Sequence, residues 1–224
     1  MPVQIRKIDS QADFKAFFEF PWKLYKDDPN WTPPLLSMRS DQLSKTKNPA
    51  WSYMEGDYFG AFRDGELVGT IAAYINHRHN EFNHEHIGWF GAFEVKDDPE
   101  AATALLNTAA DWVKAKGYEI MRGPQTFTTH EETGLLVDGF TRPILLMPYN
   151  LPYYEKLVLG AGLHAVMDTY SFYLSREDVN ASGLDERLGR ITQSIMKRNK
   201  VTIRQIDRKN LKQEFELFKE LYNA

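Results

Sequence analysis

Apolar and polar side chains alternate along residues 3–8 (VQIRKI), and this period of two predicts a first β-strand. From Ser10 the spacing changes, because aromatic residues up to Tyr25 recur at helical intervals and Ser10 is a suitable N-cap. Pro21 has no backbone donor, so we expect this helix to break or kink there. A second, short helix is predicted around residues 40–45 (SDQLSK).

The clearest local pattern is a hairpin at the Asp64–Gly65 dipeptide, a pair of residues typical of tight turns. It joins strand-like runs at 58–62 (YFGAF) and 67–76 (LVGTIAAYIN). The polar residues 76–86 (NHRHNEFNHEH) are expected to form the tip of a second hairpin. They lead into 87–95 (IGWFGAFEV), an almost wholly apolar run typical of a central strand buried on both faces.

Helical and strand patterns alternate through the rest of the chain. The strongest helix pattern covers residues 98–117, with Asp98 as N-cap and Pro99 at the first helical position. Residues 123–150 are irregular but too apolar for a linker, so we expect them to pack over one end of a sheet. The other predicted elements are strands at 118–123 and 164–175, a short helix at 152–163 and a helix ending near residue 200.

An internal repeat appears near the end of the chain. Residues 201–218 (VTIRQIDRKNLKQEFELF) match residues 3–20 (VQIRKIDSQADFKAFFEF) at Val, Ile, Arg, Ile, Asp, Phe and Phe in the same spacing. A repeat at this distance indicates duplication of a whole domain, so a second copy is predicted to begin near Val201. The alternative is a chance agreement between two ordinary strand-to-helix starts.

Composition narrows the possible functions. The chain has 224 residues, 42% hydrophobic residues, no cysteine and a formal net charge of -4. Thiolate metal sites and a cysteine nucleophile are excluded, and a reducing, cytoplasmic location is expected. No run approaches the roughly 20 apolar residues of a membrane span, and the acidic balance gives no basic field for nucleic acid. We therefore predict neither a membrane nor a nucleic-acid partner.

The polar stretch at 76–86 contains two His-x-His pairs. His77 with His79, and His84 with His86, would each share a strand face, so two pairs across a hairpin could hold zinc. Alternation alone does not supply converging geometry. We therefore prefer the interpretation as a polar hairpin tip and predict no metal site.

The order of elements over residues 3–174 resembles the GNAT family of acyl-CoA N-acyltransferases. The motifs GELVGTIAAY, IGWFGAFEV and YYEKLVLGAGL carry this resemblance, and KLYKDDPNWTPPLL, NHRHNEF and GLLVDGF are similar to a bacterial branch with two such domains in tandem. The resemblance implies an α/β (α+β) fold with a mixed, mainly antiparallel central sheet flanked by helices. It also implies a GNAT-like domain at 1–180, a connecting helix at 181–200 and the first strand and helix of a second, truncated copy at 201–224.

The same resemblance implies where acetyl-CoA or another acyl-CoA would bind. Its pantetheine amides would pair with the strand backbone from Phe93 to Val95, as an added strand does. Its pyrophosphate would lie on the start of the following helix, at Lys96, Asp98 and Ala101, where backbone N–H groups are unpaired.

The residues at that helix start argue against a phosphate site. The family's turn is rich in glycine, whereas KDDPEAA has none, and Asp97, Asp98 and Glu100 place carboxylates where phosphates would lie. Each like-charge pair about 8 Å apart costs on the order of 2 kcal/mol at an effective dielectric constant near 20. Three such charges could outweigh the dipole's contribution of roughly 1 kcal/mol. Binding of CoA in this domain is therefore doubtful.

Several residues are candidates for the chemistry. By resemblance, Tyr154 would protonate the departing CoA thiolate and Glu94 would take a proton from the amine. The alternatives are a core aromatic at Tyr154 and a solvated strand end at Glu94. His130, Glu131 and Glu132 would bind a cationic amine or relay its proton, or else belong to a solvated loop.

Two hypotheses follow from these observations. The first is a GNAT-type N-acyltransferase that moves an acyl group from CoA to a small-molecule amine, with a second copy able to supply the CoA site in place of this half. The second is a non-catalytic GNAT-like module for substrate binding or domain docking. The second hypothesis predicts contact with a second GNAT-like domain, or self-association, through the C-terminal arm. The glycine-free acidic turn favours the second hypothesis.

Overall fold

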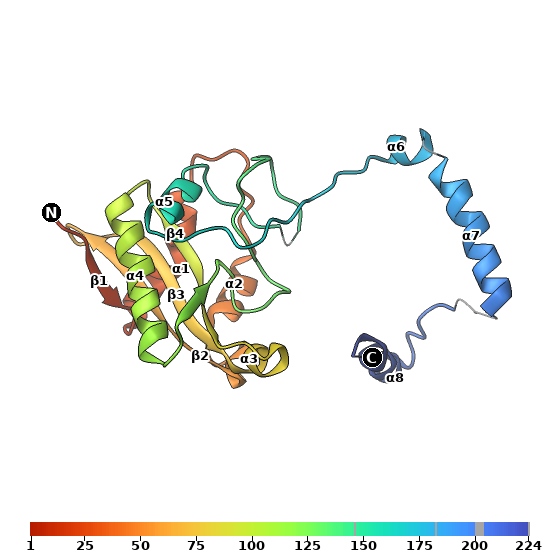
Figure 1. Cartoon of the computed structure of the whole chain (residues 1–224), viewed down its shortest axis with the longest axis horizontal. Helices are drawn as coiled ribbons and strands as arrows, with labels where there is room; N and C mark the ends of the chain where they lie inside the picture. Colours follow the sequence, from red (N-terminus) through yellow and green to blue (C-terminus); the bar gives the residue numbers. More distant parts are fainter. Residues whose placement is uncertain (146, 182, 200–203, 224) are drawn as a thin grey trace. The chain divides into compact units, whose positions relative to one another are not determined.

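A computed structural model of the chain describes residues 1–145, 147–181, 183–199 and 204–223. The residues form two compact units, Met1–Val166 and Met167–Ala224 (Figure 1). The domain boundaries predicted near residues 180 and 200 remain predictions, because the compactness of a unit does not reveal whether it repeats another.

A five-stranded sheet forms the centre of the first unit, with strand order β1-β2-β3-β4-β5. Neighbouring strands are antiparallel except for the parallel pair of β4 and β5. The fold class predicted from the sequence, a mixed and mainly antiparallel sheet flanked by helices, is confirmed. The strands are β1 (Gln4–Lys7), β2 (Met54–Arg63), β3 (Glu66–Asn76), β4 (Ile87–Val95) and β5 (Ile120–Arg122).

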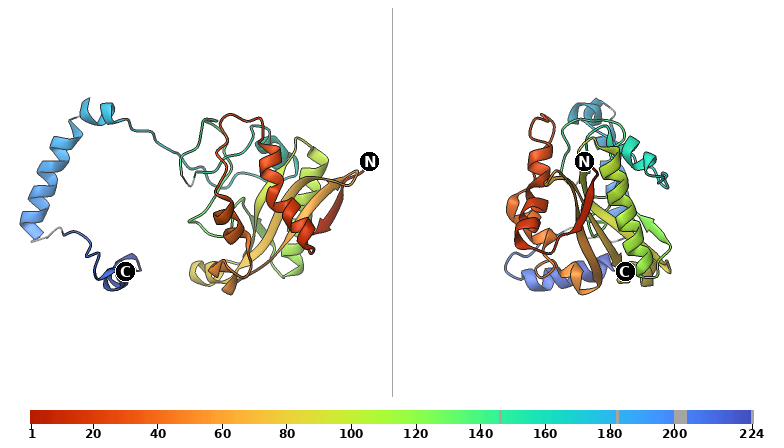
Figure 2. Two further views of the ribbon diagram at one scale, coloured as in Figure 1. Left: turned by 180° about the vertical axis from the view of Figure 1, so that it is seen from behind. Right: turned by 90° about the vertical axis from the view of Figure 1, so that its left-hand side faces the viewer.

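Helices cover both faces of the sheet (Figure 2). On one face, side chains from α1 (Gln11–Leu24) and α2 (Leu36–Leu43) pack into a core with Tyr58 and Tyr74 of the sheet. On the other face lie α4 (Pro99–Ala115) and α5 (Tyr154–Gly160). Because β4 is buried on both faces by these layers, its apolar run is explained.

The outer edge of β4 is paired over only part of its length. β5 pairs with Ile87–Trp89, and the Gln125 N–H then donates to the Phe90 carbonyl at 2.9 Å. The register between β3 and β4 shifts between Thr70 and Ala72, and Ala92 has a φ of 44°. This irregularity is a β-bulge, which bends a strand and re-aims its side chains. Glu94 and Val95 therefore lie beyond the bulge, paired with β3 on one side but past the end of β5 on the other.

Most predicted helices and strands are confirmed within a few residues. Ser10 caps α1 by accepting from the Asp13 N–H, and Asp98 caps α4 by accepting from the Ala101 N–H. The turn at Asp64 and Gly65 has φ values of 54° and 84°, as the primed hairpin turns require. Asparagine caps a short 3-10 helix, η1 (Pro49–Ser52), just before β2.

The structure departs from three expectations. The helix α1 continues through Pro21, because Pro21 is buried together with Phe17 and Phe20 and the packing holds the helix together. The polar stretch does connect the antiparallel strands β3 and β4 as a hairpin tip, but it contains a helix that was not predicted, α3 (His77–Asn83), whose first turn is capped where the Asn76 side chain accepts from the His79 N–H. Residues 164–175 form no strand, since no described segment pairs with their backbone.

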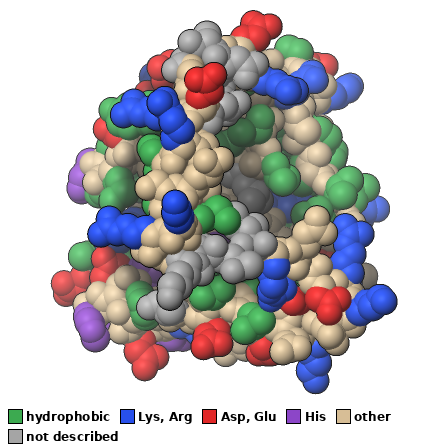
Figure 3. Space-filling view, turned by 90° about the vertical axis from the view of Figure 1, so that its right-hand side faces the viewer, with side chains coloured by type: hydrophobic (Ala, Val, Ile, Leu, Met, Phe, Trp, Pro, Cys, Tyr) green, Lys and Arg blue, Asp and Glu red, His purple; other side chains and the backbone are tan. Residues whose placement is uncertain are grey.

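The second unit contains α6 (Arg176–Ala181), α7 (Leu184–Asn199) and α8 (Leu211–Tyr222). The predicted connecting helix at 181–200 thus corresponds mainly to α7. The predicted second copy would begin with a strand, and Val201 and Ile203 of that strand lie outside the described residues. Figure 3 shows hydrophobic side chains open at the surface among lysine and arginine. Among the described helices, none is long and apolar enough to cross a membrane.

Candidate functional site

Three side chains from distant parts of the chain meet at the end of β4. The hydroxyl groups of Tyr25 and Tyr154 each donate to Glu94 Oε2 at 2.7 Å. The two hydroxyl oxygens are 3.4 Å apart. Glu94 and Tyr154, which the sequence suggested as base and acid, are therefore brought together. Their roles in catalysis remain predictions.

Packing fixes both tyrosines. Tyr25 follows the last residue of α1, is 1% exposed and stacks on Trp31 with 5.0 Å between ring centroids. Tyr154 is the first residue of α5, is 1% exposed and contacts the ring of Phe93 edge-on at 5.8 Å. The two hydroxyls therefore reach Glu94 from opposite ends of the first unit's sequence.

Burial governs the protonation of these groups. It raises the pKa of Glu94 to about 7, whereas the hydrogen bonds from Tyr25 and Tyr154 and the charge of Arg39 pull the pKa down. Burial, followed by the neighbouring Glu94 charge, raises the pKa of both tyrosines well above the usual value. Near neutral pH the tyrosines are therefore neutral donors, and Glu94 exchanges a proton.

The peptide groups of Val95 point to the edge of β4 that has no partner strand. The Val95 N–H donates to the Tyr154 hydroxyl at 3.0 Å, and the Tyr153 hydroxyl donates to the Val95 carbonyl at 2.8 Å. Tyr154 thus accepts one hydrogen bond and donates another. Val95 and Phe93 were predicted to pair with pantetheine. In this structure two tyrosines already satisfy the Val95 groups, while the side chain of Phe93 is buried in the core.

The start of α4 is occupied by the protein's own carboxylates. The Asp98 side chain accepts from the Ala101 N–H at 3.1 Å, and Arg63 donates to Asp98 and Glu100 at 2.8 Å each. Partial burial is the largest single influence on the pKa of Asp98 and raises it. The hydrogen bonds from Ala101 and Arg63 and the Arg63 charge together outweigh burial and hold the pKa below its usual range, so Asp98 stays charged. The Lys96 N–H is used in the sheet, where it donates to the Val68 carbonyl.

The candidate acceptor residues lie in the loop after β5. His130 and Glu132 are exposed, whereas Glu131 is partly buried. Glu132 lies 3.5 Å from the buried Arg39 guanidinium, and its charge is one of the influences that raise the pKa of Glu94. Burial also raises the pKa of Glu131. Glu132 thus belongs to the electrostatic surroundings of Glu94, and the binding of an amine by His130, Glu131 and Glu132 stays a prediction.

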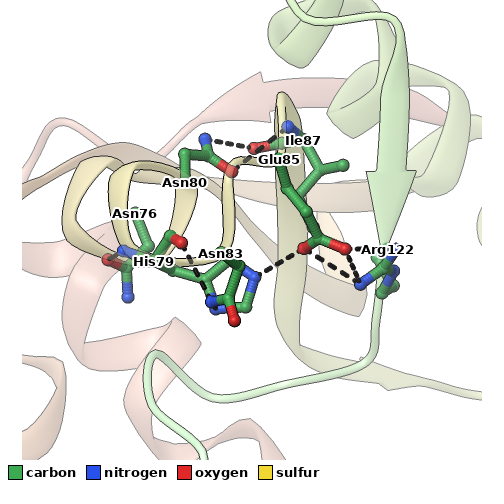
Figure 4. Close-up of polar contacts among 7 residues, drawn as sticks. All are labelled: Asn76, His79, Asn80, Asn83, Glu85, Ile87 and Arg122. Carbon is green, nitrogen blue, oxygen red and sulfur yellow. Dashed lines mark hydrogen bonds and ion pairs between the residues drawn. The ribbon is translucent and has the colours of Figure 1, made fainter.

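The histidine-rich stretch forms a hydrogen-bond network instead of two facing pairs (Figure 4). His79 Nε2 lies 2.8 Å from Glu85 Oε2, and Arg122 donates to the same carboxylate at 3.3 Å. His86 instead stacks on Tyr118 and contacts the Gly117 carbonyl. Within the described part of the chain, His, Asp and Glu side chains form no group of three that could hold a metal ion.

Sequence reasoning did not identify the roles of Tyr25 and Arg39. Tyr25 was recognised only as one of the aromatic residues at helical spacing, and it lies 69 residues from Glu94 in the chain. The only available signal was the apolar strand itself. A carboxylate at Glu94 needs buried donors, but the sequence does not say which of the eleven tyrosines supply them.

Two curated bacterial proteins match nearly the whole chain. Protein YghO of Escherichia coli (strain K12) is 34% identical over 221 residues, which is 98% of this chain and 55% of that protein. A bacterial ceramide synthase of Caulobacter vibrioides (strain NA1000 / CB15N) is 32% identical over 223 residues, covering 96% and 56% respectively. The chain therefore spans about half the length of these relatives. No family model matches it.

Acetyltransferases are among the solved structures to which the chain is similar. One is a predicted acetyltransferase with acetyl-CoA from Clostridium acetobutylicum, with a TM-score of 0.47, 9% identity and coverage of 76% and 96% of the two chains. Another is an aminoglycoside acetyltransferase from an uncultured soil sample in complex with sisomicin, with a TM-score of 0.46, 11% identity and coverage of 77% and 95%. This similarity is weak in both identity and TM-score, so the GNAT resemblance rests on the sequence motifs, and the tandem arrangement stays a prediction.

Proposed function

We propose that the protein is a GNAT-type N-acyltransferase, which forms an amide from an activated acyl donor and an amine. One observation carries the proposal: Glu94, beyond the bulge of β4, has a pKa near 7 and is held by two tyrosine hydroxyls. A carboxylate with this proton affinity is suited to general-base catalysis near neutral pH.

The residues suggest how the proton moves. As the amine nitrogen attacks the acyl carbon, the C–N bond forms, the bond to the donor's leaving group breaks and Glu94 takes one proton from nitrogen. The leaving group departs with its electron pair and needs a proton. Tyr154, the predicted donor of that proton, is hydrogen-bonded to Glu94 at 2.7 Å. The group that receives a proton and the group that gives one up are therefore in direct contact.

The relative named ceramide synthase supports the choice of acceptor. Ceramide is an amide of a long-chain amino alcohol, so the reaction in that name joins an acyl group to an amine. We therefore take a long-chain amino alcohol as the first acceptor to test, and an acyl-CoA as the first donor. The Glu94 carboxylate and the nearby Glu131 and Glu132 would attract the ammonium form of such an acceptor.

The direct experiment incubates the chain with acyl-CoA and a long-chain amino alcohol and measures the amide by mass spectrometry. We expect amide formation, and a loss of roughly 100-fold or more in Glu94→Gln, the upper part of the range for a general base. Glu155→Gln is the matched control, because Glu155 is an exposed acid next to Tyr154 on α5. Full activity in Glu94→Gln would contradict the assignment of the base.

A second candidate function is a GNAT-like module that does not bind CoA itself. The occupied Val95 peptide groups and the carboxylates at the start of α4 favour it, since both regions are where the cofactor would bind. In a tandem protein the acyl donor would then bind to another domain, and this domain would bind substrate or dock against its sister domain.

Titration calorimetry with acetyl-CoA distinguishes these functions. Heat of binding at submillimolar acetyl-CoA would contradict the hypothesis that this domain does not bind CoA. Absence of heat would indicate that the acyl-donor site lies outside this domain. Asp98→Ser with Glu100→Gln keeps a capping hydroxyl and removes both carboxylate partners of Arg63. If the acidic helix start is what repels CoA, this double variant binds acetyl-CoA at least tenfold more tightly. Glu66→Gln, an exposed acid at the start of β3, is the control.

A further inference from the structure

Tyr25 differs from Tyr154 in one respect. The Tyr25 hydroxyl bonds to the Glu94 carboxylate but makes no hydrogen bond to a backbone group among the described residues. Its hydroxyl donates to Glu94 Oε2 at 2.7 Å and lies 3.4 Å from the Tyr154 hydroxyl. Tyr154, by contrast, also accepts from the Val95 N–H. Tyr25 is buried between Trp31, which stacks on it at 5.0 Å, and Tyr149, whose ring centroid is 6.1 Å away.

The loop that carries Trp31 is itself fixed to another part of the first unit. The Tyr149 hydroxyl donates to the Asp28 carboxylate at 2.7 Å, and the Asn30 side chain donates to the Phe140 carbonyl at 3.2 Å. These bonds join the segment after α1 to the segment at 140–149. The position of the Tyr25 hydroxyl is therefore set by the surrounding packing and not by its bond to Glu94, as pre-organisation of a functional group requires.

We propose that Tyr25 is a positioning residue of the reaction: its hydroxyl holds the Glu94 carboxylate by Oε2 and leaves Oε1 to take the proton of the acceptor amine. This inference rests on the proposed function of Glu94 as the base. Two donors on one oxygen fix the plane of the carboxyl group, whereas a single donor from Tyr154 would let the group rotate. Both donors also favour the ionised form, the form that accepts a proton.

Other polar and charged groups near Glu94 also affect its protonation, and they come from several elements of the first unit. Tyr154 and Tyr153 come from the start of α5, Arg39 from α2 and Glu132 from the loop after β5. Arg39 lowers the pKa of Glu94 and Glu132 raises it, so these two charges, which pair with each other, partly cancel. Removing the Tyr25 hydroxyl changes one donor and leaves all of these charges in place.

The experiment compares Tyr25→Phe with Tyr58→Phe. Both changes remove one hydroxyl from a buried ring, but the Tyr58 hydroxyl donates to the Leu43 carbonyl at 2.7 Å and not to Glu94. The readouts are the titration of the Glu94 carboxyl, followed by NMR with ¹³C-labelled glutamate and assigned with Glu94→Gln, and the pH profile of kcat. In Tyr25→Phe we expect the pKa of Glu94 and the acid limb of kcat to move up together by about one unit. KM for the amine should stay within about twofold, since Tyr25 does not contact the substrate.

The outcomes separate this inference from the proposed function. A Glu94 titration that Tyr25→Phe leaves in place, or that Tyr58→Phe moves equally, would overturn the role of Tyr25 even if acyl transfer is observed. Wild-type protein that forms no amide with any tested acyl donor would overturn the proposed function, and with it any part of Tyr25 in the reaction. A parallel shift of titration and kcat in Tyr25→Phe alone supports both.

Discussion

The Val95 peptide group illustrates how much the site depends on single hydroxyls. Its N–H has the Tyr154 hydroxyl as its partner, and its carbonyl has the Tyr153 hydroxyl. Tyr154→Phe leaves a buried donor unpaired, so we expect a loss of about 1–3 kcal/mol in the free energy of unfolding, measured with urea. Tyr153→Phe is the comparison, because an unpaired carbonyl is tolerated better than an unpaired N–H. Equal small losses in both variants would contradict this account.

Glu94 also makes stability depend on pH in a predictable direction. Its pKa is about 7 in the folded protein and ordinary, near 4.5, in the unfolded chain. Between these values the folded state holds a proton that the unfolded state has released, so the free energy of unfolding falls as the pH rises. The total loss is about 3 kcal/mol by pH 8, at the rate of 1.36 kcal/mol per pKa unit.

Glu94→Gln removes this ionisation while leaving the other titrating groups in place. We expect the stability difference between Glu94→Gln and wild type to be small at pH 4.5 and to grow in favour of the variant up to pH 8. Urea unfolding of both proteins at several pH values measures this difference. A difference that does not change with pH would contradict the raised pKa.

The sequence could suggest Glu94 and Tyr154, since each falls on a motif of the family that the chain resembles. It could not supply Tyr25, because nothing in the helical spacing of α1 distinguishes a tyrosine that reaches a carboxylate 69 residues away from one that only packs. Nor could it show that the Val95 peptide group is satisfied within the chain. Long-range hydrogen bonds of this kind depend on the angle between elements, which local patterns do not specify.

At the scale of elements, Gly91 sets how closely β4 approaches the segment after β5. A Cβ at Gly91 would lie 1.9 Å from the Gln125 carbonyl oxygen, a backbone atom that cannot rotate away. We expect Gly91→Ala to cost several kcal/mol in the free energy of unfolding, by the overpacking mechanism, or to prevent folding. Gly160→Ala at the end of α5 is the matched control, since an added Cβ there meets nothing within 4 Å. Thermal unfolding that treats the two variants alike would count against this packing.

Elements with a strong local signal were predicted well, and elements that depend on a partner were not. The caps at Ser10 and Asp98 and the Asp64–Gly65 turn are decided by neighbouring residues, and all three are confirmed. Residues 164–175 alternate as a strand does, but alternation becomes a strand only when another backbone pairs with it. The helix α3 was missed because its polar sequence has no apolar stripe and depends on the Asn76 cap.

At the scale of the whole molecule, the internal repeat offers a comparison within one chain. Ile8, Phe17 and Phe20 are 8%, 2% and 3% exposed in the first copy of the motif. Their equivalents by the predicted repeat, Ile206, Phe215 and Phe218, are 66%, 61% and 64% exposed. In the first copy a sheet covers these residues, with Tyr58 of β2 against Phe17 at 5.0 Å between ring centroids. The predicted second copy therefore calls for a second covering sheet.

We predict that Phe215 and Phe218 become buried in a longer polypeptide that carries such a sheet. Phe215→Ser should then lower the free energy of unfolding by about 3 kcal/mol or more, as truncation of a buried phenylalanine does. In the 224-residue chain the same change should have little effect, whereas Phe17→Ser should be costly in both. Urea unfolding of the two polypeptides tests this, and sedimentation reports whether the exposed face drives self-association instead. A neutral Phe215→Ser in the longer protein would argue for a chance repeat.

The two tyrosines at the start of α5 connect the free edge of β4 with the carboxylate of Glu94. Tyr153 and Tyr154 engage both polar groups of one β4 residue, and Tyr154 also engages the carboxylate beside it. A small outward displacement of this helical turn would expose the Val95 N–H and carbonyl at the edge of β4, where an extended ligand with amide groups could pair with them. The same movement would break the hydrogen bond from Tyr154 to Glu94. Binding of a ligand at this strand edge and the proton affinity of Glu94 would thus be coupled, because both depend on the same helical turn.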